Sequence, residues 1–244
     1  MNPREVFEQE KCEMIARQGA DEPLRQITRE WFEKTCEYKY SYNFTWLGIP
    51  IIQYPQDILA MQELVWRIRP ELIIETGVAH GGSLILSASL LELIGGSGRV
   101  VGIDVDIRPH NRKAIEAHPM MKRITLLEGS SIADETVARV EGIAKGKAPI
   151  LVILDSNHTH AHVARELEVY SSLVTAGSYL VVFDTVIEDM PGPFPDRPWG
   201  RGNNPKTAVR EFLKENDRFV VDSEMESKLL VTVAPEGYLR CVRE

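Results

Sequence analysis

The chain has 244 residues and a formal net charge of −8, with 43% hydrophobic and 26% charged residues. This length suits one sizeable domain with an extension, or two small domains, with enough apolar material for a hydrophobic core. The acidic balance argues against a nucleic-acid partner, because proteins that bind phosphate backbones concentrate Lys and Arg. The one local basic patch is formed by Arg108, Arg112 and Lys113.

The cysteines and the N-terminus indicate the compartment. Cys12, Cys36 and Cys241 are far apart and form no CxxC pair, which is typical of reduced thiols rather than of a disulfide framework. The first residues are charged throughout and show no secretory signal, and no apolar stretch approaches the roughly 18 residues of a membrane span. We therefore expect a soluble, cytoplasmic protein without a membrane span.

The first elements of the chain are predicted to be two short amphipathic helices, broken near Gly19 and Pro23. Residues 38–55 are then dense in aromatic side chains. The simpler interpretation is a packing segment or lid laid over the core. The alternative is that aromatic side chains of this segment wall an active site or a subunit interface. The side chains considered for that role are Tyr38, Tyr40, Tyr42 and Trp46.

After a predicted helix over residues 56–69, apolar strand-like runs alternate with helical patterns. Continuous apolar strands separated by helices are typical of a parallel sheet that is covered on both faces. We expect an α/β fold with a doubly wound, mostly parallel, seven-stranded sheet. The five parallel strands are predicted at residues 72–76, 99–105, 123–129, 149–155 and 178–184.

The C-terminal part is predicted to begin with the long Pro- and Gly-rich loop 186–205, and a loop of that length is usually functional or mobile. A helix over 205–216 follows it. Residues 218–224 and 229–235 are close enough in sequence to form a hairpin, so the last strand is expected to be antiparallel to the others.

In a doubly wound sheet, ligands bind at the carboxyl ends of the strands. The first parallel strand is followed by "ETGVAHGGS", whose glycines permit a tight turn and a close approach of the backbone to a ligand. The next helix would offer its free N–H groups to polar atoms of that ligand. The cofactor-binding residues predicted here are Glu75, Gly77, Ala79, Gly81, Gly82 and Ser83.

The second and third strands end in Asp104 and in "EGSS". Asp104 is placed to accept hydrogen bonds from ribose hydroxyls, and Ser130 and Ser131 are placed to approach an adenine edge. These strand ends predict an adenosine-containing cofactor, either a nicotinamide dinucleotide or S-adenosylmethionine. Glu75 favours S-adenosylmethionine, because a carboxylate attracts its cationic methionine portion and repels a pyrophosphate.

The fourth and fifth strands end in Asp155 and Asp184, at neighbouring positions in this topology. Two converging carboxylates form a hard-oxygen site that suits Mg²⁺ or a similar ion. Such an ion would gather a substrate hydroxyl, lower its pKa and orient it toward an electrophilic methyl group.

Taken together, the motifs "IIETGVAHGGS", "VGIDVDIRP", "LLEGSS", "ILDSNH", "AGSYLVVFD" and "NPKTAVREFL" resemble the cephalosporin-hydroxylase / rhamnosyl O-methyltransferase family over roughly residues 38–240. The resemblance implies a class I methyltransferase fold, S-adenosylmethionine, a divalent cation and frequently a homo-oligomer. We expect residues 1–55 to form an extension that serves as lid or oligomer contact, and residues 56–244 to form the methyltransferase domain.

The resemblance also assigns roles to single residues. Asp155 and Asp184 match metal-ligand positions, and Asp155 would also border the cofactor and take part in catalysis. His158 matches the general base of macrolide-sugar methyltransferases. Relatives often have Glu-Asp at the end of the fifth strand, whereas this chain has Phe183 before Asp184. Completion of the ion's shell is then left to Asn157, Thr185, Glu188 or water.

The function that the sequence favours is O-methylation of a hydroxyl on a sugar or a glycosylated small molecule. A zinc site would pair His158 with His162 and add Asp155, but the glutamate of an H-E-x-x-H motif is missing. Small-molecule hydroxylation would need two His and one carboxylate around iron. A non-catalytic cofactor-binding partner is the third alternative, and Phe183 favours it. His160 and His162 are interpreted as helix-start residues at the surface or at the substrate rim.

Overall fold

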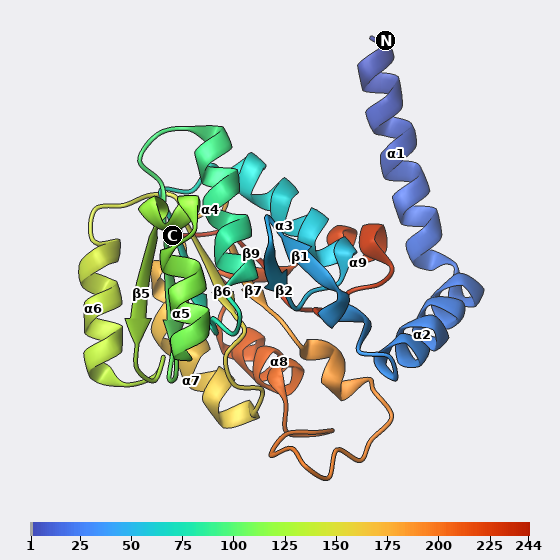
Figure 1. Ribbon diagram of the computed structural model, residues 1–244. Helices are drawn as coiled ribbons and strands as arrows, with labels where there is room; N and C mark the ends of the chain where they lie inside the picture. The colour runs from blue at the N-terminus through green and yellow to red at the C-terminus, as the bar shows by residue number, and fades with distance from the viewer. Residues whose placement is uncertain (1) are drawn as a thin grey trace.

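A seven-stranded sheet with the order β5-β4-β3-β6-β7-β9-β8 forms the centre of the computed structural model, which describes residues 2–244 (Figure 1). The strands from β5 to β7 pair in parallel, and β9 is antiparallel to both β7 and β8. The predicted doubly wound, mostly parallel sheet is confirmed. The strands are β3 (Leu72–Thr76), β4 (Arg99–Asp104), β5 (Ile124–Glu128), β6 (Ile150–Leu154), β7 (Tyr179–Val182), β8 (Phe219–Val221) and β9 (Tyr238–Cys241).

Helices cover both faces of the sheet, which explains why its strands read as continuous apolar runs. Alternate residues of one strand enter different cores: Ile73 packs on one face, whereas Leu72 and Ile74 pack on the other. The first face is covered by α3 (Pro55–Ile68), α4 (Gly82–Ile94), α5 (Pro109–Glu116) and α9 (Ser223–Leu229). The second is covered by α6 (Asp134–Ala144), α7 (His160–Tyr170) and α8 (Pro205–Glu215).

The C-terminal antiparallel pair is present, but the prediction placed its second strand at the wrong residues. Residues 229–235 are not a strand; the pair is formed by β8 and β9, with α9 between them. The apolar run is buried all the same, because its polar groups bond to the buried carboxylate of Asp57. Val233 N donates to Asp57 Oδ2 at 3.0 Å, and Thr232 Oγ1 donates to Asp57 Oδ1.

The two predicted N-terminal helices are present as α1 (Pro3–Ala20) and α2 (Glu22–Cys36). Contrary to the prediction of two short amphipathic helices, α1 runs for 18 residues and buries a single side chain, that of Ile15. The break falls at Asp21, whose side chain caps α2 by accepting from Leu24 N at 3.0 Å. In Figure 1, α1 projects away from the sheet as a long arm. Its end is attached to α9, because Gln18 Nε2 donates to Ser227 O at 2.8 Å.

The aromatic segment forms a short hairpin of β1 (Phe44–Trp46) and β2 (Ile49–Ile51) beside α4. Trp46 Nε1 donates to Ser89 Oγ on α4 at 3.0 Å, and the ring of Tyr40 packs on Tyr54. Tyr38 and Tyr42 are exposed. These contacts favour the packing interpretation of this segment. The remaining helices are short 3₁₀ turns at Tyr40–Asn43, Pro119–Arg123, Ser171–Leu173 and Thr185–Glu188, the last labelled η4.

Between residues 2 and 244, no helix is both long enough and apolar enough to cross a membrane. The three cysteines are free thiols in the structure.

Candidate active site at the carboxyl edge of the sheet

The chain turns sharply between β3 and α4. Gly77 has a φ of +92° and Gly81 a φ of +91°, a backbone conformation that favours glycine. A Cβ on Gly77 would also clash with the carbonyl oxygen of Asp155 at the end of β6. The two strand ends therefore approach so closely that a side chain at position 77 is excluded.

This turn walls a hollow at the carboxyl edge of the sheet, which we call the glycine-loop hollow. The amino end of α4 opens into it, and backbone N–H groups at a helix start are free to bind polar ligand atoms. The hollow has the position expected for a cofactor at the carboxyl edge of the sheet. Its lining residues are Pro50, Ile52, Gln53, Asp155 and residues 77–83.

Glu75 lies directly behind this wall. It is buried, and its Oε1 accepts a hydrogen bond from Ser83 Oγ, while its Oε2 has no partner. Burial raises the pKa of Glu75 to about 7. Ser83 lines the hollow and Glu75 does not, so the predicted acidic residue lies behind Ser83 and not in the wall of the hollow. An unpaired buried carboxylate oxygen there favours a cationic group in the hollow.

Asp104 braces the loop. Its Oδ2 accepts from Val78 N at 2.8 Å and from Ala79 N at 3.3 Å, and its Oδ1 accepts from Asp106 N at 3.1 Å. Its carboxylate is thus already engaged by backbone donors at the position where the sequence predicts ribose binding.

The serines after β5 lie in different environments. Ser130 is half-buried, whereas Ser131 is buried and turned toward α7, with its Oγ 3.0 Å from His162 Nε2. The structure therefore does not bring Ser131 to the glycine-loop hollow.

Three potential ion ligands meet beside the hollow. Asp155, His158 and Asp184 each offer one ligand atom, and these atoms all lie within 4.8 Å of one another. His158 Nε2 is 3.3 Å from Asp184 Oδ2. Burial, and then the charge of Asp184, raise the pKa of Asp155 well above its ordinary value. Two carboxylates and an imidazole with this spacing fit a divalent cation, whose charge would relieve their repulsion. We call them the Asp155–His158–Asp184 cluster.

Phe183 does not face this cluster. Its ring is buried and packs edge-on against Tyr238, with 6.4 Å between the ring centroids. The residues proposed to replace a missing ligand are engaged elsewhere. Thr185 Oγ1 donates to Pro235 O, Asn157 Oδ1 accepts from Thr159 N, and Glu188 Oε2 accepts from Gly202 N.

The other two histidines of the 158–162 segment join α7 to its neighbours. His160 Nδ1 lies 2.8 Å from Thr207 Oγ1 of α8. His162 Nε2 lies 3.2 Å from Ser156 Oγ and 3.5 Å from the buried carboxylate of Glu166. Both are structural contacts within the described chain, and only His158 joins the cluster.

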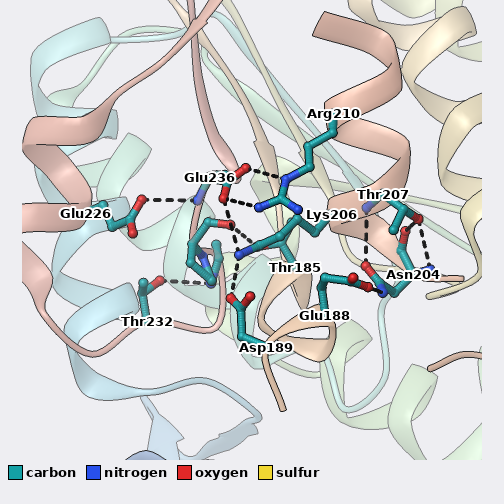
Figure 2. Close-up of polar contacts among 12 residues, drawn as sticks. Thr185, Glu188, Asp189, Asn204, Lys206, Thr207, Arg210, Glu226, Thr232 and Glu236 are labelled. Atoms are coloured by element: carbon teal, nitrogen blue, oxygen red, sulfur yellow. Dashed lines mark hydrogen bonds and ion pairs between the residues drawn. The ribbon is translucent and has the colours of Figure 1, made fainter. Parts of the chain in front are cut away.

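The predicted long loop is anchored at both ends (Figure 2). Lys206 is a buried lysine at the start of α8, and its Nζ lies 2.5 Å from Asp189 Oδ2 and 3.5 Å from Glu236 Oε1. Glu188 Oε2 also accepts from Asn204 Nδ2 at 2.5 Å. These contacts hold η4, which follows directly on Asp184.

Two side chains at the site are not among the residues predicted from the sequence. The anchored loop places Trp199 edge-on to His158, with ring centroids 5.7 Å apart. Gln53, which follows β2, lines the glycine-loop hollow, and its Nε2 is 3.4 Å from Asp155 Oδ2. The only sequence signal for Gln53 is one polar residue between apolar neighbours, and Trp199 carries no signal beyond the composition of its loop.

The chain was compared with known families and structures. Residues 38–242 match the model of the family described as Rhamnosyl O-methyltransferase/CmcI. The Rhamnosyl O-methyltransferase of Mycobacterium tuberculosis H37Rv is 32% identical over 199 residues, which are 80% of this chain and 77% of the relative. That of Mycobacterium leprae is 30% identical and covers 80% of this chain and 82% of its own length.

Solved structures agree on the fold. A CmcI structure described with Mg and SAM has a TM-score of 0.59 at 22% identity, and the match covers 82% of this chain and 77% of CmcI. An O-methyltransferase from Bacillus cereus in complex with SAH has a TM-score of 0.53 at 18% identity, covering 87% and 90% of the two chains. The match of family model and relatives over most of the sequence shows that the chain belongs to the Rhamnosyl O-methyltransferase/CmcI family.

Proposed function

We propose that this protein transfers the methyl group of S-adenosylmethionine to a hydroxyl of a sugar or a glycosylated small molecule, with the help of a divalent cation. One observation carries the proposal: the Asp155–His158–Asp184 cluster and the glycine-loop hollow share Asp155. A methyl donor in the hollow and a hydroxyl at the cluster would therefore be neighbours. The names of the relatives and the ligands of the solved structures support the same reaction.

The cofactor would be held by the predicted loop, with Gly77, Gly81 and Gly82 allowing close approach of the backbone. Ser83 would line its site, and Glu75 would supply negative charge from behind it. Bound S-adenosylmethionine supplies an already activated methyl group. The remaining task of the protein is to place the acceptor hydroxyl in line with that group, and orientation of this kind contributes much of an enzymatic rate enhancement.

Asp155 and Asp184 would hold the ion, and Mg²⁺ suits their oxygen ligands. When bound, the ion supplies Lewis acidity toward the acceptor hydroxyl. His158 would take the proton, and the carboxylate of Asp184, whose Oδ2 lies 3.3 Å from His158 Nε2, would stabilise the imidazolium that results. Trp199 packs edge-on to the His158 ring, so the base is held beside the ion site.

The acceptor is proposed to be a sugar because the curated relatives are named rhamnosyl O-methyltransferases. Trp199 supports this assignment, since an indole beside the base offers an apolar wall for a sugar ring. The hydroxylase alternative gains no support, because the cluster formed in residues 2–244 has one histidine and two carboxylates rather than two histidines and one carboxylate. Self-association, which the family resemblance implies, stays a prediction.

The experiment is calorimetric titration with S-adenosylhomocysteine, with and without Mg²⁺, followed by transfer of labelled methyl from S-adenosylmethionine to 4-nitrophenyl α-L-rhamnopyranoside and to glycosides of other sugars. We expect cofactor binding, and methyl transfer that stops when the ion is chelated. Asp184→Asn should abolish transfer, whereas Asp134→Asn, at a fully exposed carboxylate, should leave it unchanged. Absence of cofactor binding would contradict the proposed function.

A further inference from the structure

We propose that Gln53 is a cofactor-contact residue, whose side-chain oxygen accepts a hydrogen bond from the ammonium group on the amino-acid portion of S-adenosylmethionine. The inference rests on the proposed function and goes beyond it, because it assigns a binding role to a residue of the N-terminal aromatic segment. It is carried by the contacts of the Gln53 amide and by its position between two parts of the site.

The amide of Gln53 is buried, with 6% of the residue exposed, and it lines the glycine-loop hollow. Its Oε1 has no hydrogen-bond partner within the described structure. A buried amide oxygen without a partner loses its hydrogen bonds to water and forms none within the protein. Such atoms are therefore rare unless a ligand donates a hydrogen bond to them. The hollow beside it is the space from which a donor can come.

The orientation of the amide follows from its neighbour. Gln53 Nε2 lies 3.4 Å from Asp155 Oδ2. With an ion bound at the cluster, Asp155 is ionised, and an ionised carboxylate only accepts hydrogen bonds. The reverse orientation would place two acceptor oxygens against each other. Asp155 therefore selects the orientation that leaves the Gln53 oxygen free for the hollow.

The position of Gln53 identifies which part of the cofactor it meets. The residue lines the hollow together with the loop 77–83 and with Asp155, which belongs to the ion cluster. For a methyl group to reach a hydroxyl at that cluster, the sulfonium centre must lie at the Asp155 side of the hollow. With the ribose expected toward Asp104, the amino-acid portion would extend from the sulfonium centre along the Asp155 side. The ammonium is the strongest hydrogen-bond donor of that portion, and the carboxylate of Glu75 behind Ser83 favours its positive charge.

The backbone around Gln53 is held on both sides, so the amide is preorganised. On one side, a Cβ on Gly82 would clash with Pro50 O, which shows how closely β2 lies on the start of α4. On the other side, Tyr54 is buried and stacks on Phe32, with ring centroids 4.8 Å apart. Preorganised groups bind with a smaller loss of conformational entropy.

The test is calorimetric titration of the full chain with two probes, S-adenosylhomocysteine and 5′-methylthioadenosine, which lacks the amino-acid portion. Gln53→Met should weaken binding of S-adenosylhomocysteine about 10- to 100-fold, the effect of losing a hydrogen bond to a charged group, and leave binding of 5′-methylthioadenosine unchanged. Gln56→Met is the matched control. Gln56 also has a buried oxygen without a partner, but it is not among the residues that line the hollow, so neither probe should be affected.

The second probe separates the hydrogen bond from folding, because a variant that folds less well would lose affinity for both probes. Equal weakening of both probes by Gln53→Met overturns the inference. So does unchanged binding in Gln53→Met. In each of these cases the wild type binds S-adenosylhomocysteine and the proposed function stands, whereas a wild type that binds neither probe overturns both.

Discussion

His158 Nε2 and Asp184 Oδ2 lie 3.3 Å apart at the ends of two neighbouring strands. The imidazole nitrogen can bind an ion or accept a proton, and it cannot do both at once. Mg²⁺ prefers oxygen ligands, so the arrangement favours the base when Mg²⁺ is the ion. The roles of base and of ion ligand predict different effects of a substitution at His158.

His158→Ala should lower kcat about 100-fold or more, which is the usual contribution of a general base. The affinity for Mg²⁺, measured by calorimetry, should change less than about threefold, because the carboxylates of Asp155 and Asp184 remain. Asp184→Asn should instead weaken Mg²⁺ binding strongly. Loss of Mg²⁺ affinity in His158→Ala would show that the imidazole is a ligand and not the base.

Binding of the ion should release protons. The pKa of Asp155 is raised by burial and by the charge of Asp184, so this carboxyl keeps its proton to a higher pH than an ordinary aspartate. A cation competes with that proton, and its affinity should therefore rise as the pH rises through the raised pKa. Titrations in two buffers with different ionisation enthalpies measure the number of protons released. A Mg²⁺ affinity that stays constant between about pH 5 and pH 8 would contradict this prediction.

Glu75→Gln should stabilise the ligand-free protein above neutral pH. The pKa of Glu75 is raised from 4.5 to about 7, so the folded state holds a proton that the unfolded state releases, and stability falls as pH rises through that interval. This pKa shift corresponds to a loss of roughly 3 kcal/mol at most in the free energy of unfolding, and the neutral amide of the Glu75→Gln variant avoids the loss. Urea unfolding at pH 5 and pH 8 measures the difference, and the same variant should bind S-adenosylhomocysteine more weakly.

Glu128→Gln is the control for this comparison, since Glu128 is exposed at the end of β5. A wild type and a Glu75→Gln variant with the same pH dependence of unfolding would show that the buried carboxyl is not the source of the effect.

Trp199→Ala should raise the KM for a rhamnoside acceptor about tenfold, because the wall beside His158 is lost, while the affinity for S-adenosylhomocysteine stays the same. Trp199→Phe keeps an aromatic face and should retain most of the acceptor affinity. Trp66→Ala, at an exposed tryptophan on α3, should leave both ligands unaffected. An unchanged acceptor KM in Trp199→Ala would remove the indole from the acceptor site.

Lys206→Met should lower the free energy of unfolding by about 2 kcal/mol, since it leaves Asp189 and Glu236 without their buried cation (Figure 2). The variant should also expose the loop before α8 to limited proteolysis. Lys214→Met, at an exposed lysine of the same helix, should change neither urea unfolding nor cleavage. Equal stability of the two variants would show that the Lys206 contacts do not hold the loop.

The strand ends were predictable because the pattern is local and the topology is regular. Glu75, Asp155 and Asp184 each follow an apolar run, and parallel strands bring such ends to one edge of the sheet. The apolar run at 229–235 was wrongly predicted to be a strand, because the contact that holds it is not local in sequence. Its backbone bonds to Asp57, a buried carboxylate far away in the chain. Gln53 and Trp199 come to the site through packing between distant segments, and periodicity carries no information about that.

The close approach of Gly77 to Asp155 has a consequence for how the two ligand sites communicate. A methyl group at position 77 would clash with the carbonyl oxygen of Asp155, a proposed ion ligand, so a change in the glycine turn should also displace the proposed ion site. A displacement of one should be transmitted to the other through this close approach and through the hydrogen bond of 2.9 Å from Asp155 N to Thr76 O. Occupancy of either site should then change the affinity of the other, and thermodynamic reciprocity requires the two changes to be equal.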